Sequence, residues 1–155
     1  MRIALLSDSH LSVDALPFPA VEADILVLAG DISRPAAAIE WAKACPIPVL
    51  YVAGNHEFYG SDLISTYEQL HRLSQGTPIH VLERTAHTHN GVRFLGCTLW
   101  SDYRLVDQAQ ERAQGIDMAT RLIRDFSRIR VSPDFPDLFT PALSQMLFMQ
   151  TVAWL

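Results

Sequence analysis

Polar side chains that can ligate metal follow each of the first three apolar runs of the chain. Asp8 and His10 follow the first run, Asp31 follows the second, and Asn55 and His56 follow the third. Two carboxylates, a histidine and an amide oxygen are ligand types that divalent metals accept in proteins. If they converge in space, these side chains can form a divalent-metal site.

Three strands must bring these side chains together. The apolar runs at residues 3–6, 25–29 and 49–53 are continuous, which is typical of strands buried on both faces of a parallel sheet. The spacing from one strand-end aspartate or asparagine to the next is 23 and then 24 residues, one strand–connection–strand period each time. Because parallel strands in register end at one edge, we expect the polar side chains to meet there. The glycines before Asp31 and Asn55 allow a sharp turn close to a ligand.

Each of these residues has an ordinary explanation when it is taken alone. An aspartate after a strand is more often a helix cap or a turn residue, and a lone histidine is more often a hydrogen-bonded surface residue than a ligand. The occurrence of such residues at three successive strand ends favours a metal site over these separate explanations.

The remaining pattern predicts an α/β chain. Asn90-Gly91 is a hairpin-turn signal between apolar strand segments. The expected strands are residues 79–82 and 92–99, and the expected helices are residues 35–44, 61–74 (capped by Ser61 or Asp62), 115–129 and 142–155.

Length and composition restrict the class of protein. A chain of 155 residues predicts a single domain over residues 1–155. The net charge of −5 argues against sequence-independent binding along nucleic acid. Two cysteines make no disulfide framework, which favours a reducing cytoplasm. The first apolar run is too short for a signal peptide, and Pro141 and several polar residues argue against a membrane span at the uncharged C-terminal segment.

The strand-end motifs resemble those of a known family. Asp8-x-His10, Gly30-Asp31 and Gly54-Asn55-His56-Glu57 are similar to the first three motifs of the calcineurin-like metallophosphoesterases, and residues 92–100 resemble more weakly a strand of bacterial members. The resemblance implies the family's fold, a calcineurin-like phosphoesterase β-sandwich flanked by helices. It also implies a two-metal enzyme that hydrolyses a phosphate mono- or diester with a metal-bridging hydroxide.

The same resemblance implies a role for each motif residue. Asp8 and His10 match ligands of the first metal, Asp31 matches the carboxylate that bridges both metals, and Asn55 matches a ligand of the second metal through its side-chain oxygen. His56 matches the catalytic histidine beside the phosphate. The implied cofactors are two divalent ions, Mn, Fe or Zn, and the implied partner is a phosphate ester, with nucleic acid only as one such substrate.

The sequence departs from the family pattern in its second half. The family completes its site with a later histidine and a Gly-His-x-His motif, and neither is present. His87-Thr88-His89 follows Ala86 and precedes the hairpin turn, so a polar hairpin segment is favoured over a ligand role. We therefore expect a fold incomplete at its C-terminus and partial metal occupancy. A natural short form, a truncation and a broken reading frame all remain open.

Three functions remain open at this stage. The first is a metal-dependent phosphoesterase, and the alternative is a non-catalytic or inactive truncated module acting in binding or assembly. A Mg²⁺-dependent phosphatase with Asp8 as nucleophile is disfavoured, because such folds usually carry Asp-x-Asp where His10 stands here.

Two surface features complete the expectations. The uncharged helix at residues 142–155 predicts a homo-oligomer through that segment. Four arginines in residues 121–130 favour a solvated helix face over a substrate-facing patch.

Overall fold

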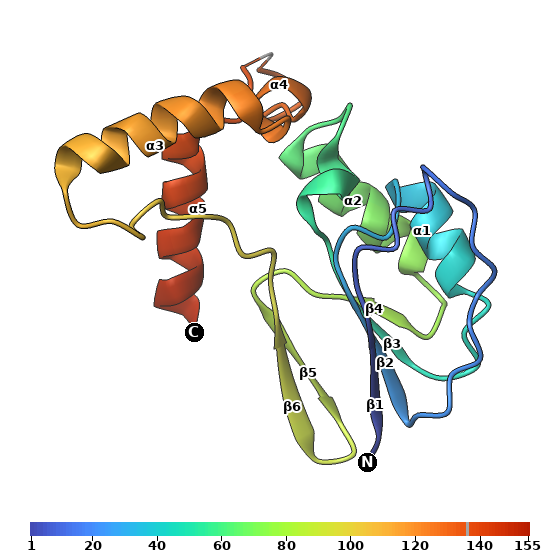
Figure 1. Cartoon of the computed structure of the whole chain (residues 1–155). Coiled ribbons are helices and arrows are strands. Elements are labelled where there is room, and N and C mark those ends of the chain that lie inside the picture. Colours follow the sequence, from blue (N-terminus) through green and yellow to red (C-terminus); the bar gives the residue numbers. More distant parts are fainter. Residues whose placement is uncertain (136) are drawn as a thin grey trace.

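The computed structural model describes residues 1–135 and 137–155. The chain is a mixed α/β structure, as expected (Figure 1). The strands are β1 (Ile3–Leu6), β2 (Ile25–Ala29), β3 (Val49–Val52), β4 (Ile79–Val81), β5 (Thr85–His89) and β6 (Val92–Gly96). The helices are α1 (Pro35–Ala42), the 3-10 turn η1 (Asn55–Phe58), α2 (Leu63–Ser74), α3 (Ala109–Leu122), α4 (Asp125–Arg128) and α5 (Pro141–Trp154).

A four-stranded parallel sheet in the order β1-β2-β3-β4 forms the centre of the N-terminal half. Leu28 of β2 pairs with Leu6 of β1 on one side and with Tyr51 of β3 on the other. The carboxyl ends of these three strands are therefore aligned. The three predicted strands and their parallel arrangement are confirmed, and the segments after them begin at one edge of the sheet.

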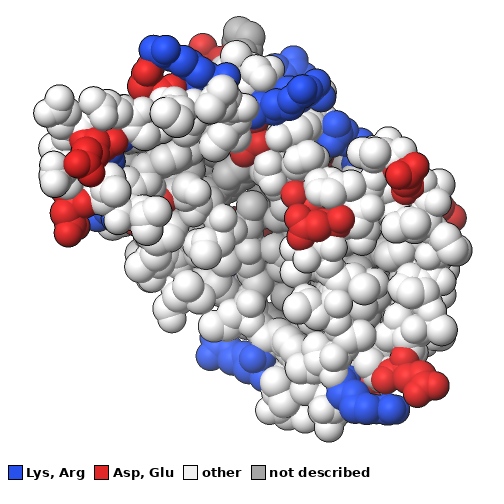
Figure 2. Space-filling view, viewed as in Figure 1, with Lys and Arg blue, Asp and Glu red and all other residues white. Residues whose placement is uncertain are grey.

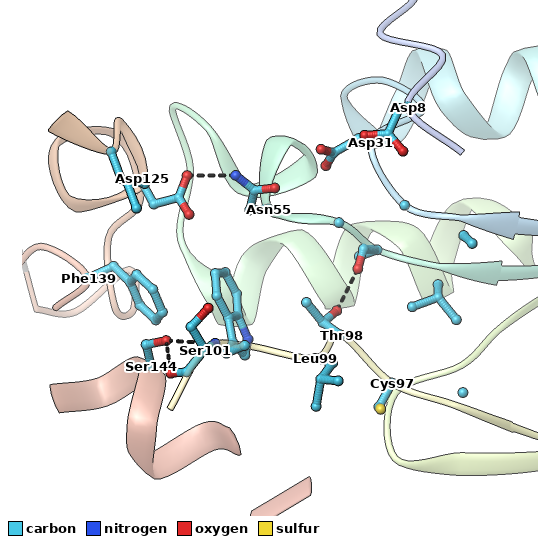
Figure 3. Close-up of a pocket in the computed structure, with 18 of the residues that line it drawn as sticks. Asp8, Asp31, Asn55, Cys97, Thr98, Leu99, Ser101, Asp125, Phe139 and Ser144 are labelled. Atoms are coloured by element: carbon cyan, nitrogen blue, oxygen red, sulfur yellow. Dashed lines mark hydrogen bonds between the residues drawn. The ribbon is translucent and has the colours of Figure 1, made fainter. Parts of the chain in front are cut away.

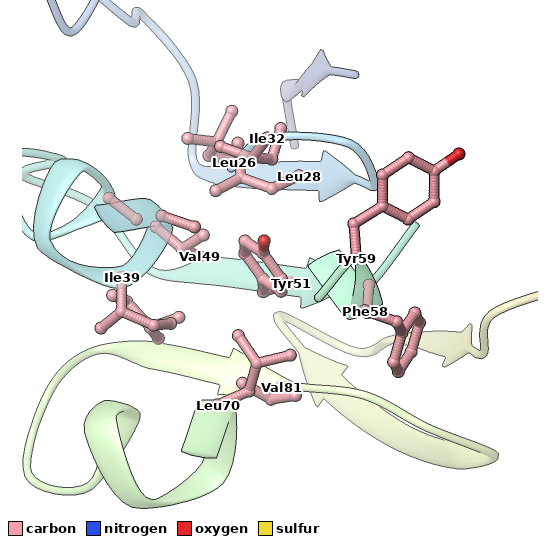
Figure 4. Packing of buried hydrophobic residues seen from close by; sticks show 14 of the residues in the cluster. Leu26, Leu28, Ile32, Ile39, Val49, Tyr51, Phe58, Tyr59, Leu70 and Val81 are labelled. Carbon is pink, nitrogen blue, oxygen red and sulfur yellow. The ribbon is translucent and has the colours of Figure 1, made fainter. Parts of the chain in front are cut away.

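The main core lies between this sheet and helices α1 and α2 (Figure 4). Leu26, Leu28, Val49 and Tyr51 project from the strands, and Ile39 of α1 packs against them, all fully buried. Asp62 caps α2 by accepting a hydrogen bond from the backbone N–H of Ser65 at 2.8 Å, so one of the two expected caps is confirmed. This packing holds the strands that carry the polar edge.

A two-stranded antiparallel hairpin of β5 and β6 packs against the other face of the sheet. Phe94 of β6 contacts the buried cluster of Ile25, Leu50 and Leu82. The turn at Asn90-Gly91 is confirmed, with φ of 47° and 79°. The prediction that the strand at residues 79–82 forms the other arm of this hairpin was wrong. Residues 79–81 pair in parallel with β3, and β6 pairs instead with residues 85–89, whose polar composition gave no strand signal.

The helix expected at residues 115–129 is wrong in extent. Helix α3 begins at Ala109, and the backbone becomes extended at Ile123, before the short helix α4. This break allows Phe126 to turn into the core, where its ring stacks on Phe139 with centroids 5.8 Å apart. One continuous helix would follow the exposed course of α3, which has no buried residue.

The expected C-terminal helix is confirmed as α5, which Thr140 caps through Leu143 N–H. Ser144 and Thr151 are buried, whereas Met146, Met149 and Val152 are each about half exposed, at 48%, 49% and 49%. No helix in residues 1–135 or 137–155 has both the length and the hydropathy of a membrane span.

Candidate metal centre

The backbone at the strand ends turns sharply. Asp8, His10 and Asp31 all lie in the left-handed region, with φ of 55°, 44° and 57°. This conformation costs a non-glycine residue about 1–2 kcal/mol, so the surrounding structure must hold it. Hydrogen bonds from Asp8 N–H to the Gly30 carbonyl (3.1 Å) and from His10 N–H to the Asp31 carbonyl (2.9 Å) tie the first loop to the second. These bonds bring the loops after β1 and β2 together at one edge of the sheet.

Three side chains from three strand ends come within metal-ligating distance of one another. The ligand atoms of His10, Asp31 and His56 all lie within 4.8 Å. The two imidazole rings meet edge-on, with centroids 4.6 Å apart. One carboxylate oxygen of Asp31 also accepts a hydrogen bond from the backbone N–H of His56 at 3.0 Å. The carboxylate therefore lies close to both imidazoles.

Asp8 lies beside this group rather than within it. Its Oδ1 is 4.0 Å from His10 Nε2, and its side chain is 71% exposed. Figure 3 shows its carboxylate next to that of Asp31 at the rim of the pocket. Asp8 can therefore ligate the same edge of a metal site from its solvent side.

Asn55 presents its amide between two carboxylates. Its Nδ2 donates a hydrogen bond to Asp125 Oδ1 at 2.7 Å. The opposite end of the amide, the Oδ1 oxygen, is turned toward Asp31 (Figure 3). An amide oxygen so directed is a suitable metal ligand.

Glu57, to which the sequence gave no role, holds two strand-end loops together. It is fully buried. Oε1 accepts hydrogen bonds from Ile32 N–H (2.8 Å) and the Tyr51 hydroxyl (2.7 Å), and Oε2 accepts from Asp31 N–H (3.1 Å) and Gly54 N–H (2.9 Å). Burial raises the pKa of this carboxyl. A sequence signal existed, since Glu57 stands three residues after Gly54, the spacing of a capping box.

The glycines are required here for space. A Cβ on Gly54 would lie 2.1 Å from Asp31 Oδ1 and 2.6 Å from Asp31 N. A Cβ on Gly30, whose φ is +87°, would lie 2.9 Å from the Cα of Gly54. The loops of β2 and β3 are therefore in direct backbone contact, which places Asp31 against His56.

Tyr59 extends the site beyond the sequence motifs. Its ring stacks on His56 with centroids 4.4 Å apart, and the guanidinium carbons of Arg34 and Arg128 lie 5.5 Å and 5.7 Å from its centroid. Arg34 also donates to the His56 carbonyl. Burial and the neighbouring Asp125 raise the pKa of the Tyr59 hydroxyl, which stays protonated. These contacts fix one face of the His56 ring.

The other expected candidates lie elsewhere or face solvent. His87 is on β5, with its ring 4.1 Å from that of His80, consistent with the expected polar hairpin segment. Arg121 pairs with Asp117 on the exposed surface of α3 at 2.7 Å. Arg124 and Arg130 are also exposed, which agrees with a solvated face, and Arg128 alone of the four contacts Tyr59.

A pocket of about 810 Å³ opens beside the strand ends (Figure 3). Asp8, Asp31, Asn55 and Asp125 line its polar side, and residues of β6, the segment after it, α4 and α5 line its apolar side. Figure 2 shows a hollow between the two halves of the molecule on a largely uncharged face, with basic side chains gathered above it. Acidic side chains lie at the edge of this hollow, and the pocket lining includes Asp8, Asp31 and Asp125.

The residues present fit a divalent transition metal. The His10 imidazole, the carboxylates of Asp8 and Asp31 and the amide oxygen of Asn55 offer mixed nitrogen and oxygen ligation, which suits Mn²⁺, Fe or Zn²⁺ better than Ca²⁺. The His56 imidazole lies beside His10 and Asp31. His10, Asp31 and His56 are all partly buried, so each keeps some contact with solvent.

Most of the chain matches the model of a known protein family. Residues 1–115 match the calcineurin-like phosphoesterase superfamily domain, and the chain belongs to that family. The match includes all three strand ends and the hairpin, and it ends within α3. No curated protein matches the chain.

Proposed function

We propose that this chain is a metal-dependent phosphoesterase that hydrolyses a phosphate mono- or diester with two divalent ions, Mn, Fe or Zn. One observation carries the proposal: His10, Asp31 and His56, from three different strand ends, place their ligand atoms within 4.8 Å of one another. Membership of the phosphoesterase family supports a phosphate ester as the substrate.

We assign to each residue the role that the family resemblance implies, and the positions of the side chains support these roles. Asp8 and His10 would hold the first ion, and Asp31, which lies close to both imidazoles, would serve both ions. Asn55 binds the second ion through Oδ1. Bound ions of this kind would neutralise phosphate charge and lower the pKa of an attacking water. His56 would then donate a proton to the leaving oxygen or stabilise charge on the phosphate. Tyr59 stacks on its ring, and Arg34 binds its backbone carbonyl.

Hydrolysis of an aryl phosphate monoester and of the matching diester by the purified chain tests this function. We expect turnover that requires added Mn²⁺ and stops with a chelator. Asp31→Asn should remove more activity than His56→Ala, because loss of the bridge disturbs both ions. Equal rates for Asp31→Asn and the parent would show that the activity belongs to a contaminant and would contradict the proposal.

A metal-binding module without hydrolysis is the alternative. It is favoured by the small donor set, since among the described residues only one group of three or more His, Cys, Asp or Glu side chains gathers within ligating distance. Mn²⁺ binding without turnover of either ester would select this alternative.

We also propose that the whole chain forms one domain whose β5–β6 hairpin belongs to the second layer of the family's sandwich. The packing of Phe94 on the open face of the parallel sheet supports this layer.

We also propose that the chain works in a reducing cytoplasm. Its two cysteines, Cys45 and Cys97, are free thiols, and burial raises the pKa of each.

The half-exposed apolar stripe of α5 supports self-association through residues 142–155. Sedimentation at micromolar concentration is the measurement, and a monomer that stays soluble at all concentrations would contradict it.

A further inference from the structure

Asp125 is a buried carboxylate with an unusual set of partners. It is only 9% exposed, yet none of the ion pairs found among residues 1–135 and 137–155 involves it. Its Oδ1 instead accepts two hydrogen bonds, from the Tyr59 hydroxyl at 2.6 Å and from Asn55 Nδ2 at 2.7 Å. Burying a carboxylate costs free energy, so its position requires a compensating role.

The contact with Asn55 determines which way that amide points. A carboxylate only accepts hydrogen bonds, so the Nδ2 end of Asn55 must face Asp125. A second contact, from Nδ2 to the Tyr59 hydroxyl at 3.4 Å, holds the same end of the amide. The Oδ1 end is therefore directed away, toward Asp31 and the candidate metal centre (Figure 3). A flipped amide would place Oδ1 against a carboxylate oxygen, which is repulsive.

The contact spans the two halves of the chain. Asp125 lies 70 residues after Asn55, on α4, beyond the residues 1–115 that match the family. The neighbouring Phe126 is buried against Phe139 and holds α4 in the core. The backbone that carries the Asp125 carboxylate is therefore fixed in position. The C-terminal region thus acts on the strand-end site through one hydrogen-bonded pair.

We propose that Asp125 is a positioning residue for metal binding: it holds the Asn55 amide with its oxygen turned to the metal. This inference rests on the proposed function, because it requires Asn55 to be a ligand. Partners that orient a ligand typically contribute about 10- to 100-fold in metal affinity.

Titration of the purified chain with Mn²⁺ alone, followed by electron paramagnetic resonance of the free ion, tests the proposal without using activity. We expect Asp125→Ala to raise the dissociation constant for Mn²⁺ by about tenfold. Asp125→Asn keeps an acceptor oxygen and should lose less. Asp62→Ala is the matched control, since Asp62 is also buried but caps α2. The Asp62→Ala variant should bind Mn²⁺ with the affinity of the parent chain.

The deciding comparison is a double-mutant cycle with Asn55→Ala. If Asp125 acts through Asn55, its replacement in the Asn55→Ala background should change the affinity by less than about twofold. Equal losses in both backgrounds would make Asp125 merely structural and overturn the proposal. Circular dichroism melts of each variant identify unfolded protein. If Asp125→Ala does not fold, Asp125→Leu, which fills a similar volume without an acceptor oxygen, supplies the comparison in its place.

The cycle also separates the two levels of inference. If Asn55→Ala weakens Mn²⁺ binding and Asp125→Ala does not, the positioning role fails and the proposed ligands stand. If Asn55→Ala itself binds Mn²⁺ like the parent, Asn55 is not a ligand, and that part of the proposed function fails first.

Discussion

Two histidine pairs in this molecule have nearly the same spacing and very different surroundings. The rings of His10 and His56 are 4.6 Å apart at the carboxyl edge of the parallel sheet, and those of His80 and His87 are 4.1 Å apart between β4 and β5. The first pair lies within ligating distance of the carboxylate of Asp31. Within the described part of the chain, the second pair belongs to no such group of three.

The backbone beneath the two pairs also differs. His80 and His87 extend from regular strands, whose pleat fixes their direction. His10 and Asp31 lie in left-handed loops that backbone hydrogen bonds tie together. Gly54 and the buried Glu57 hold the Asp31 loop against the His56 loop. Proximity of two imidazoles is therefore a common result of packing, whereas a metal centre also needs an acidic ligand and a backbone turned to supply it.

The largest expected effect follows removal of Glu57. Glu57→Ala leaves three backbone N–H groups and the Tyr51 hydroxyl without their hydrogen-bond acceptor, in the loops that carry Asp31 and His56. We therefore expect the free energy of unfolding to fall by about 4 kcal/mol. Glu83, near the second pair, accepts from the Tyr67 hydroxyl and Thr98 N–H, and its replacement should cost about 2 kcal/mol. Urea unfolding measures both.

The exposed Glu68 of α2 provides the control for this comparison. Glu68→Ala should change the free energy of unfolding by no more than about 0.5 kcal/mol. Equal losses for Glu57→Ala and Glu83→Ala would show that the strand-end loops are no more dependent on their carboxylate than the hairpin region is.

The next effect concerns the glycines beside each pair. Gly54→Ala would push its Cβ into Asp31, and we expect a loss of about 3 kcal/mol together with weaker Mn²⁺ binding. Gly91→Ala at the hairpin turn meets no atom within 4 Å and adds only the strain of its φ of +79°, about 1 kcal/mol. Thermal melts and Mn²⁺ titrations measure the two losses. Unchanged Mn²⁺ affinity in folded Gly54→Ala would argue against Asp31 as a ligand.

A smaller effect separates the pairs by metal affinity. His10→Ala removes a proposed ligand and should weaken Mn²⁺ binding by at least about tenfold, roughly 1.4 kcal/mol. His87→Ala, the matched change in the second pair, should bind Mn²⁺ like the parent in calorimetric titrations. Equal weakening in both variants would mean that the ion binds outside the strand-end site or at both places.

The smallest effect is a pH dependence at the second pair. Burial and the nearby His80 and His89 lower the pKa of His87 below its ordinary value of 6.5. As pH falls through 6.5, the unfolded chain gains a proton at this position before the folded chain does, so acidification lowers stability. His87→Gln should show a shallower loss between about pH 7 and pH 5 in urea unfolding. A steeper loss in the variant would contradict the direction of this shift.

Residue types and spacing were sufficient to predict the first half of the fold. Three continuous apolar runs at nearly equal spacing led to three parallel strands, and the polar residues after them led to one sheet edge. The pattern failed where local composition and pairing disagreed. Residues 85–89 form a strand only because β6 pairs with them, and the break at Ile123 exists because Phe126 packs against Phe139.

The sequence alone determined the ligand types and the edge where they meet, because strand periodicity and chain direction are local properties. Tertiary structure alone decided which of those ligands touch and what orients them. Glu57 reaches across two loops, and Asp125 reaches Asn55 from 70 residues away. Such contacts depend on how separate elements pack in space, and no local pattern of residues encodes that packing.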